Sequence, residues 1–189
     1  MKKLLRLIPT LALILLTACS PLPGQATEQL EATLNQPAKM TGKLTKQDIA
    51  YQVEILTDPS QNLFNIRFLS GDEVSGLTVE FFDGGSYISF DDLRFKTNKA
   101  FFTSLERLKN AYQSLAAPDT PKTIADTDIN QSMRLKEVML NDKSAALYIN
   151  ENFSSPLRLI IHGENSLTLD IESYESIQPP PTVESTPET

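Results

Sequence analysis

The sequence contains one cysteine, one histidine and no tryptophan among its 189 residues. A single cysteine excludes a disulfide framework within the chain, and one cysteine with one histidine cannot supply a metal site built from several such ligands. Positive charge is also scarce, because 17 Lys and Arg stand against 24 Asp and Glu, for a formal net charge of −7. Binding to nucleic-acid phosphates needs clustered cations. We therefore expect no nucleic-acid partner, no metal and no cofactor.

Apolar residues are frequent by comparison, at 40% of the chain. This content and length suit one folded domain with a hydrophobic core, and they exclude a wholly disordered chain.

Residues 1–18 have the pattern of a secretory signal peptide, with three cations before an apolar run. The run is too short to span a bilayer comfortably. It ends in Leu-Thr-Ala-Cys at residues 16–19, which resembles the bacterial lipobox, in which the cysteine thiol is diacylated and the preceding peptide is removed. We predict lipidation of Cys19 and a lipid-anchored protein on the extracytoplasmic side of the cell membrane. The alternative is an ordinary signal peptide cut elsewhere, which would leave Cys19 as a free thiol.

The remaining chain divides into three parts. Residues 19–37 contain several prolines and a stretch that could form only a short, marginal helix, so we expect a lipidated N-terminus and spacer there. Residues 38–178 are expected to form a β-rich domain. Residues 179–189 begin with three prolines and continue with Thr, Glu and Ser, which predicts a disordered tail. A recognition role for this proline run is the alternative.

Alternation of apolar and polar residues with a period of two indicates strands with one buried side. The clearest segments are 49–55, 64–68, 77–81, 87–90, 147–149, 157–161 and 167–171, and weaker ones are 38–46, 93–97 and 135–140. Gly84-Gly85 and Gly163 mark two hairpin turns. We expect about eight or nine strands in an antiparallel meander.

One segment has helical spacing instead, since apolar residues recur every three or four positions between Phe101 and Ala116. Pro118 and Pro121 end it. Residues 117–134 are polar and predict a long loop. The expected fold class is mainly β with one amphipathic helix (α+β), as a curved antiparallel sheet with the helix packed on its concave, apolar face.

This order of parts, with the stretch at 62–68 that leads to Ser75-Gly76-Leu77, resembles the LolA/LppX group of bacterial periplasmic and cell-surface proteins. The resemblance implies an open half-barrel, covered by helices, around an apolar cavity that accepts acyl chains. With its lipobox cysteine, the chain is more similar to the membrane-tethered relatives than to the soluble carrier.

Few residues suggest catalysis. His162 alternates onto the polar side of its strand, which predicts a surface histidine, and Asp91 and Asp92 open a turn. Serine occurs in no G-x-S-x-G or suitable S-x-x-K pattern. We expect no catalytic residues.

An acidic cluster repeats part of a calcium-binding loop. Asp126, Asp128, Asn130 and Glu137 match positions 1, 3, 5 and 12 of an EF-hand. Gln131 stands where that loop needs glycine, so a solvated acidic loop is the favoured interpretation and calcium binding the alternative.

The leading hypothesis is a non-catalytic binding or carrier module for lipid or lipoprotein acyl chains. The acyl chain of the ligand would lie between the helix and the strands. It would contact residues that any core would also use: Phe64, Ile66, Phe68, Val79, Phe81, Leu105 and Leu108. One member of each of the pairs Phe81-Phe82 and Phe101-Phe102 is a further aromatic that either the core or a groove could use. An alternative is an adaptor or assembly factor that recruits another cell-envelope protein through a sheet edge or the tail. A hydrolase is the third interpretation, and it predicts a polar cleft with a carboxylate of raised pKa.

Overall fold

The computed structural model describes residues 23–71, 73–82, 85–97, 102–129 and 133–177. The expected signal peptide (1–18), Cys19 and the tail (179–189) lie outside the described residues. The helices and strands are α2 (Pro23–Leu34), β1 (Ala38–Lys46), β2 (Ile49–Asp58), the 3-10 turn η1 (Pro59–Gln61), β3 (Leu63–Phe68), β4 (Thr78–Phe82), β5 (Gly85–Phe90), β6 (Leu93–Thr97), α3 (Thr103–Ala116), β7 (Lys122–Ile129), β8 (Met133–Leu140), β9 (Ala145–Asn150), β10 (Pro156–Ile161) and β11 (Leu167–Ser176).

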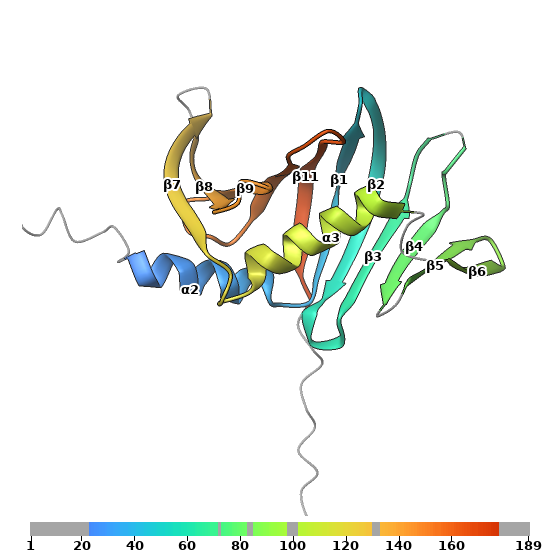
Figure 1. The fold of residues 1–189 in the computed structure, drawn as a ribbon, viewed down its shortest axis with the longest axis horizontal. Coiled ribbons are helices and arrows are strands. Elements are labelled where there is room, and N and C mark those ends of the chain that lie inside the picture. The colour runs from blue at the N-terminus through green and yellow to red at the C-terminus, as the bar shows by residue number, and fades with distance from the viewer. Residues whose placement is uncertain (1–22, 72, 83–84, 98–101, 130–132, 178–189) are drawn as a thin grey trace, which may run out of the picture.

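All eleven strands form one open antiparallel sheet, in the order β6-β5-β4-β3-β2-β1-β11-β10-β9-β8-β7. Each half of the chain is a meander, and the pairing of β1 with β11 joins the two halves. The sheet is strongly curved, and β6 and β7 are its two edges (Figure 1). The expected mainly β, antiparallel fold is therefore confirmed, with eleven strands in the described part of the chain instead of the eight or nine expected.

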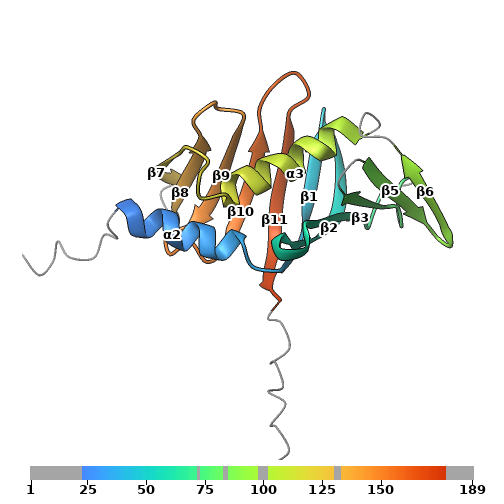
Figure 2. The same cartoon turned by 60° about the horizontal axis from the view of Figure 1, so that its bottom comes forward.

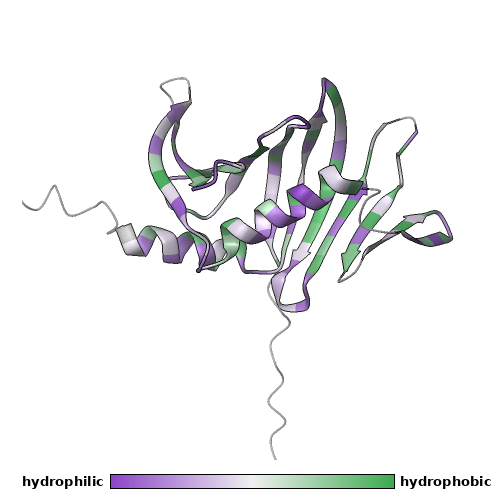
Figure 3. Ribbon diagram, in the orientation of Figure 1, coloured by the Kyte–Doolittle hydropathy of each residue, from purple (hydrophilic) through white to green (hydrophobic). Residues whose placement is uncertain are grey.

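The alternation seen in the sequence sets the two sides of the sheet. In β3, β4 and β2 from Val53 onward every second residue is buried, and the residues between them are half-buried or exposed. Figure 3 shows the same alternation as hydrophobic and hydrophilic bands along the strands. The buried apolar residues of these strands belong to the same core cluster as those of α3.

Both helices lie on the same side of the sheet (Figures 1 and 2). Helix α3 buries the apolar stripe predicted from its spacing, including Leu105, Leu108 and Leu115. Hydrogen bonds tie the two helices together: Asn35 Nδ2 donates to Ala116 O at 2.9 Å, and Tyr112 Oη donates to Leu34 O at 3.3 Å.

Helix α2 differs from the spacer expected over residues 19–37. Its Leu30 and Leu34 are fully buried, with Ala26 beside them in the core. The helix is marginal by itself, so the apolar surface that it buries against α3 and the sheet accounts for its formation. The folded body thus includes residues 23–37 as well.

Strand β7 corrects the prediction of a long loop over residues 117–134. It pairs along its whole length with β8, from Lys122 opposite Leu140 to Ile129 opposite Met133. Most of its described side chains are exposed, so the strand shows little of the apolar alternation that reveals a half-buried strand. Strand β7 is held by backbone hydrogen bonds to β8, and these bonds cannot be predicted from the pattern of side chains.

Candidate functional site: a groove beside helix α3

An open groove of about 390 Å³ lies beside the first turn of α3; we call it the α3 groove. Its volume is within the range of about 300–1,000 Å³ that is typical of small-molecule sites. Strands β1, β2 and β3, the 69–77 connection, the start of β11 and the start of α3 all contribute to it. The lining residues are Leu44, Lys46, Tyr51, Phe68, Val74, Leu77, Phe102, Thr103, Ser104, Leu105 and Leu167.

An aromatic pair forms part of the groove wall. Tyr51 and Phe68 meet edge to face with ring centroids 5.6 Å apart, a favourable arrangement for two aromatic rings. They come from adjacent strands, because Val53 of β2 lies opposite Phe68 of β3. The two rings are therefore brought together by the pairing of β2 with β3, although they are far apart in the sequence.

The 69–77 connection supplies two aliphatic residues, Val74 and Leu77. Backbone bonds hold it closed: Phe68 N donates to Leu77 O and Gly76 N donates to Phe68 O, both at 2.8 Å. Gly71 has φ +114°, and a Cβ there would lie only 3.0 Å from Val74 and 3.1 Å from Tyr51. Glycine thus lets this connection pack tightly against the aromatic wall.

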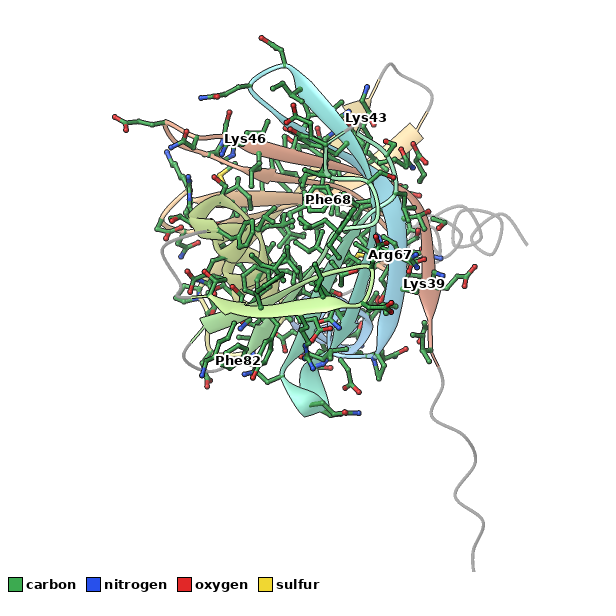
Figure 4. All side chains as sticks on the ribbon, turned by 90° about the vertical axis from the view of Figure 1, so that its right-hand side faces the viewer. Lys39, Lys43, Lys46, Arg67, Phe68 and Phe82 are labelled. Atoms are coloured by element: carbon green, nitrogen blue, oxygen red, sulfur yellow. The ribbon has the colours of Figure 1, made fainter. Side chains whose placement is uncertain are left out.

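The lining of the groove also includes polar residues. Lys46, the last residue of β1, donates from Nζ to Ser104 Oγ of α3 at 2.9 Å. Figure 4 shows Lys46 on the same side of the sheet as α3 and Lys43 on the opposite side. Among the described lining residues, Lys46 carries the one formal charge. The α3 groove therefore has a mainly apolar lining with one cation beside the first turn of α3.

The seven residues predicted to bind a ligand do not line one cavity. Phe68 and Leu105 line the α3 groove, whereas Phe81 lines a depression of about 370 Å³ beside Phe82, Tyr87 and Arg94. The other four are packed in the core with 2% exposure or less: Phe64, Ile66, Val79 and Leu108. The Phe64 ring, for example, packs against Phe81 and Tyr112.

Several lining residues were not identified from the sequence as site residues. Lys46 and Ser104 are 58 positions apart, and Leu167 lies more than 60 positions beyond them. Phe102 was considered, as one of two phenylalanines that could exceed the needs of the core, and it does line the groove. Phe101 lies outside the described residues. The signal that could have identified Lys46 is its position, since it shares the inward side of β1 with Met40 and Leu44.

A second groove, of about 440 Å³, lies beside the middle of α3; we call it the polar groove. Its lining combines amides, hydroxyls and charged groups with a few apolar residues: Arg107, Asn110, Ala111, Ser114, Thr120, Pro121, Leu140, Asn141, Asp142, Ser144 and Ile161. Hydrogen bonds from the backbone amide and the hydroxyl of Ser144 lower the pKa of Asp142.

The β10–β11 turn lies between the two grooves, since it joins Ile161 of the polar groove to Leu167 of the α3 groove. Arg107 of α3 holds this turn by donating to the carbonyl oxygens of His162 and Asn165. The His162 side chain is exposed, as predicted.

The EF-hand alternative is wrong, because the residues concerned lie in a β-hairpin. Asp126 and Asp128 are in β7 and Glu137 is in β8. Asp126 is paired with Lys136, and Glu137 Oε1 accepts a hydrogen bond from Tyr148 Oη at 2.6 Å. Asn130 lies outside the described residues. Over the ranges that the structure describes, no three His, Cys, Asp or Glu side chains come together as a metal site.

Neither of the two described helices is long and apolar enough to cross a membrane.

Comparison with known proteins yields similarity at the level of fold. No family model and no curated protein matches the sequence. Among solved structures, an uncharacterized conserved protein from Thermus thermophilus is 11% identical with a TM-score of 0.53, covering 84% of this chain and 90% of that chain. The LolA superfamily protein NE2245 from Nitrosomonas europaea is 10% identical with a TM-score of 0.42, covering 85% of this chain and 96% of that chain. LprF from Mycobacterium bovis is 12% identical with a TM-score of 0.40, covering 82% of this chain and 94% of that chain. At 11% identity, the likeness to the Thermus thermophilus protein is one of fold alone.

Proposed function

We propose that the protein is a non-catalytic, lipid-anchored binding or carrier module of the cell envelope that accepts an acyl chain in the α3 groove. The acyl chain would lie against the concave side of the sheet, along the Tyr51–Phe68 wall and beneath the start of α3. Lipidation of Cys19 would hold the module on the extracytoplasmic side of the membrane.

The apolar lining of the α3 groove carries this proposal. Eight of its eleven lining residues are aliphatic or aromatic. Burying such surface against an acyl chain would contribute about 25 cal/mol for each Å² removed from water. The core around Phe64 and Leu108 is already filled by side chains, so the open groove is the better place for a ligand.

A non-catalytic role agrees with the chemistry of the polar groove. A hydrolase of the kind considered above would need a carboxylic acid whose pKa is raised. In the polar groove the hydrogen bonds from Ser144 instead lower the pKa of Asp142, which favours its ionised form.

Photo-crosslinking would test the proposal on the whole chain in lipid nanodiscs. A palmitic acid probe with a diazirine in its chain should label peptides that contain α3-groove residues. Val74→Trp should reduce this labelling about tenfold, the effect of losing about 1.4 kcal/mol of binding, because an indole would occupy the groove.

Ile49→Trp is the matched control, because Ile49 is exposed and does not line the groove. It should label like the wild type. Labelling spread evenly over the chain, or equal effects of the two variants, would contradict the proposal.

The adaptor alternative is favoured by one specific observation, the exposed edge strand β6. Leu93 and Phe95 are 59% and 56% exposed, and β5 is the neighbour of β6 within the described sheet. Arg94 lies over the Tyr87 ring and is paired with Glu80, and Lys96 lies over the Phe82 ring. This edge would suit an extended segment of another envelope protein that adds a strand and carries acidic residues.

A photoreactive residue at position 95 in producing cells would test this second candidate. We expect one adduct, with the crosslink in an extended acidic segment of a second protein. The same photoreactive residue placed at position 69 should give no adduct, although Leu69 is also exposed. An adduct with a second copy of this chain, or no adduct, would remove the adaptor proposal.

A further inference from the structure

The charge of the α3 groove is opposite in sign to that of the chain. The chain has a net charge of −7, yet among the described residues that line the groove the charged one is a lysine. An apolar ligand alone would gain nothing from an ammonium group beside it, and burying a charge costs free energy unless it is paired. We therefore expect Lys46 to contact the polar part of a ligand.

The ammonium of Lys46 lies beside apolar lining residues of the same groove. Lys46 ends β1, and its side chain reaches the first turn of α3, where Nζ lies 2.9 Å from Ser104 Oγ. Both residues are half-buried. An ammonium has three donors and a hydroxyl has one, so the pair can offer further hydrogen bonds to a ligand oxygen next to it.

We propose that the α3 groove selects single-chain amphiphiles with an anionic oxygen head group, a carboxylate or a phosphate monoester. The head would pair with Lys46 and Ser104 while the tail lies against Tyr51, Phe68 and Leu105. This inference rests on the proposed acyl-chain function and adds the class of head group to it.

The three classes of head group have different consequences beside Lys46. An anionic head forms charge-assisted hydrogen bonds with Lys46, which are shorter and stronger than neutral ones. A neutral hydroxyl forms weaker bonds there. A quaternary ammonium has no hydrogen to donate to Ser104 Oγ, and Lys46 would repel it.

The test compares three diazirine probes with the same alkyl chain: palmitic acid, hexadecanol and hexadecyltrimethylammonium. The whole chain in nanodiscs is labelled with each, and the yield is measured on groove peptides. For the wild type we expect about a tenfold higher yield for the acid than for the alcohol, as for one charge-assisted contact at a half-exposed site, and less still for the cation.

Variants of Lys46 separate charge from fold. Lys46→Gln should lower the labelling yield of the acid probe to that of the alcohol probe and leave the yield of the alcohol probe unchanged. Lys46→Arg should keep the higher yield of the acid probe. Lys43→Gln is the control, since it removes the same charge from the opposite side of the same strand. Thermal unfolding of each variant shows whether the fold is intact.

The possible results are distinguishable. Equal groove labelling by acid and alcohol in the wild type would overturn the anionic selectivity and leave the acyl-chain function standing. No groove labelling by any probe would overturn both. Acetate or inorganic phosphate should not compete with the acid probe, and competition by either would show a site for a free anion, which also overturns the inference.

Discussion

Gly42 illustrates how one residue shapes the sheet. It sits at an irregularity in β1, where Thr41 pairs with Ser173 but Gly42 pairs with Ile171, so that Glu172 of β11 is the extra residue of a bulge. A Cβ on Gly42 would overlap the Asp170 carbonyl oxygen and lie 3.0 Å from Ile171 Cα. The strands that join the two halves of the sheet can approach this closely because position 42 has no side chain.

Gly42→Ala should therefore lower the free energy of unfolding by about 1–3 kcal/mol, as overpacking does in a dense interior. Gly24→Ala is the control, because nothing lies within 4 Å of a Cβ at that position in α2. It should change the free energy of unfolding by less than about 0.5 kcal/mol, since Gly24 is exposed in the first turn of α2. Urea unfolding of both variants measures the difference, and a neutral Gly42→Ala would show that β1 and β11 can separate at no cost.

Tyr112 links stability to pH. Burial raises the pKa of its phenol well above the ordinary value. The folded state therefore keeps the proton at a pH where the unfolded chain has released it. This contribution to stability is fully present below about pH 10, the pKa of tyrosine in an unfolded chain, and it decreases as the pH rises further.

Above pH 10, the free energy of unfolding should fall with pH less steeply in Tyr112→Phe than in the wild type, by about 1.4 kcal/mol per pH unit. At pH 7 the phenol is neutral in the folded and in the unfolded chain, and the variant should lose hydrogen bonding of the hydroxyl group, including the bond to Leu34 O, at about 1 kcal/mol per bond. Urea unfolding from pH 7 to pH 11 measures both effects. Parallel pH profiles for the two proteins would contradict this account.

At the scale of elements, Lys122 connects three of them. Its side chain is 3% exposed, and Nζ lies 2.8 Å from Glu31 Oε1 of α2. The same ammonium donates to Leu115 O at 3.1 Å and to Ala117 O at 2.7 Å, at the carboxyl end of α3. It thus satisfies helix-end carbonyls and stabilises the negative end of the helix dipole.

Lys122→Met should lower the free energy of unfolding by about 3–5 kcal/mol, because it leaves Glu31 half-buried without its cation and two carbonyls without a donor. Arg158→Met provides the comparison. Arg158 and Asp170 form an exposed ion pair, so its loss should change stability little. Similar losses in both variants, measured by urea unfolding, would mean that the junction of α2, α3 and β7 does not depend on Lys122.

The elements differ in how far the sequence predicted them. Alternation in segments such as 64–68 and 167–171 predicted strands that bury every second side chain, and the spacing from Leu105 to Leu115 predicted α3. Strand β7 was missed because an edge strand with few buried side chains depends on backbone bonds to its neighbour. The stability of α2 was missed because its few apolar residues gain from surfaces that lie far away in the sequence.

At the scale of the whole molecule, the anchor at Cys19 stays a prediction. Cys19→Ser should abolish incorporation of labelled palmitate, since a hydroxyl cannot replace the thiol that the lipid modifies. Ser20→Ala should leave incorporation unchanged, because the cysteine is intact. The same label on both variants, measured after immunoprecipitation from producing cells, would disprove lipidation at this residue.

The sequence by itself determined the strand-rich composition of the fold, the position of α3 and the expectation of a lipobox. These follow from local periodicity and short motifs, which depend on neighbours a few residues apart. It could not determine which apolar residues fill the core and which line an open surface, since Phe64 and Phe68 follow the same alternation. That distinction came from the tertiary structure, in which β1, β3, β11 and α3 bring Lys46, Phe68, Ser104 and Leu167 to one groove. Packing between distant segments decides where the surface remains open, and no local pattern records it.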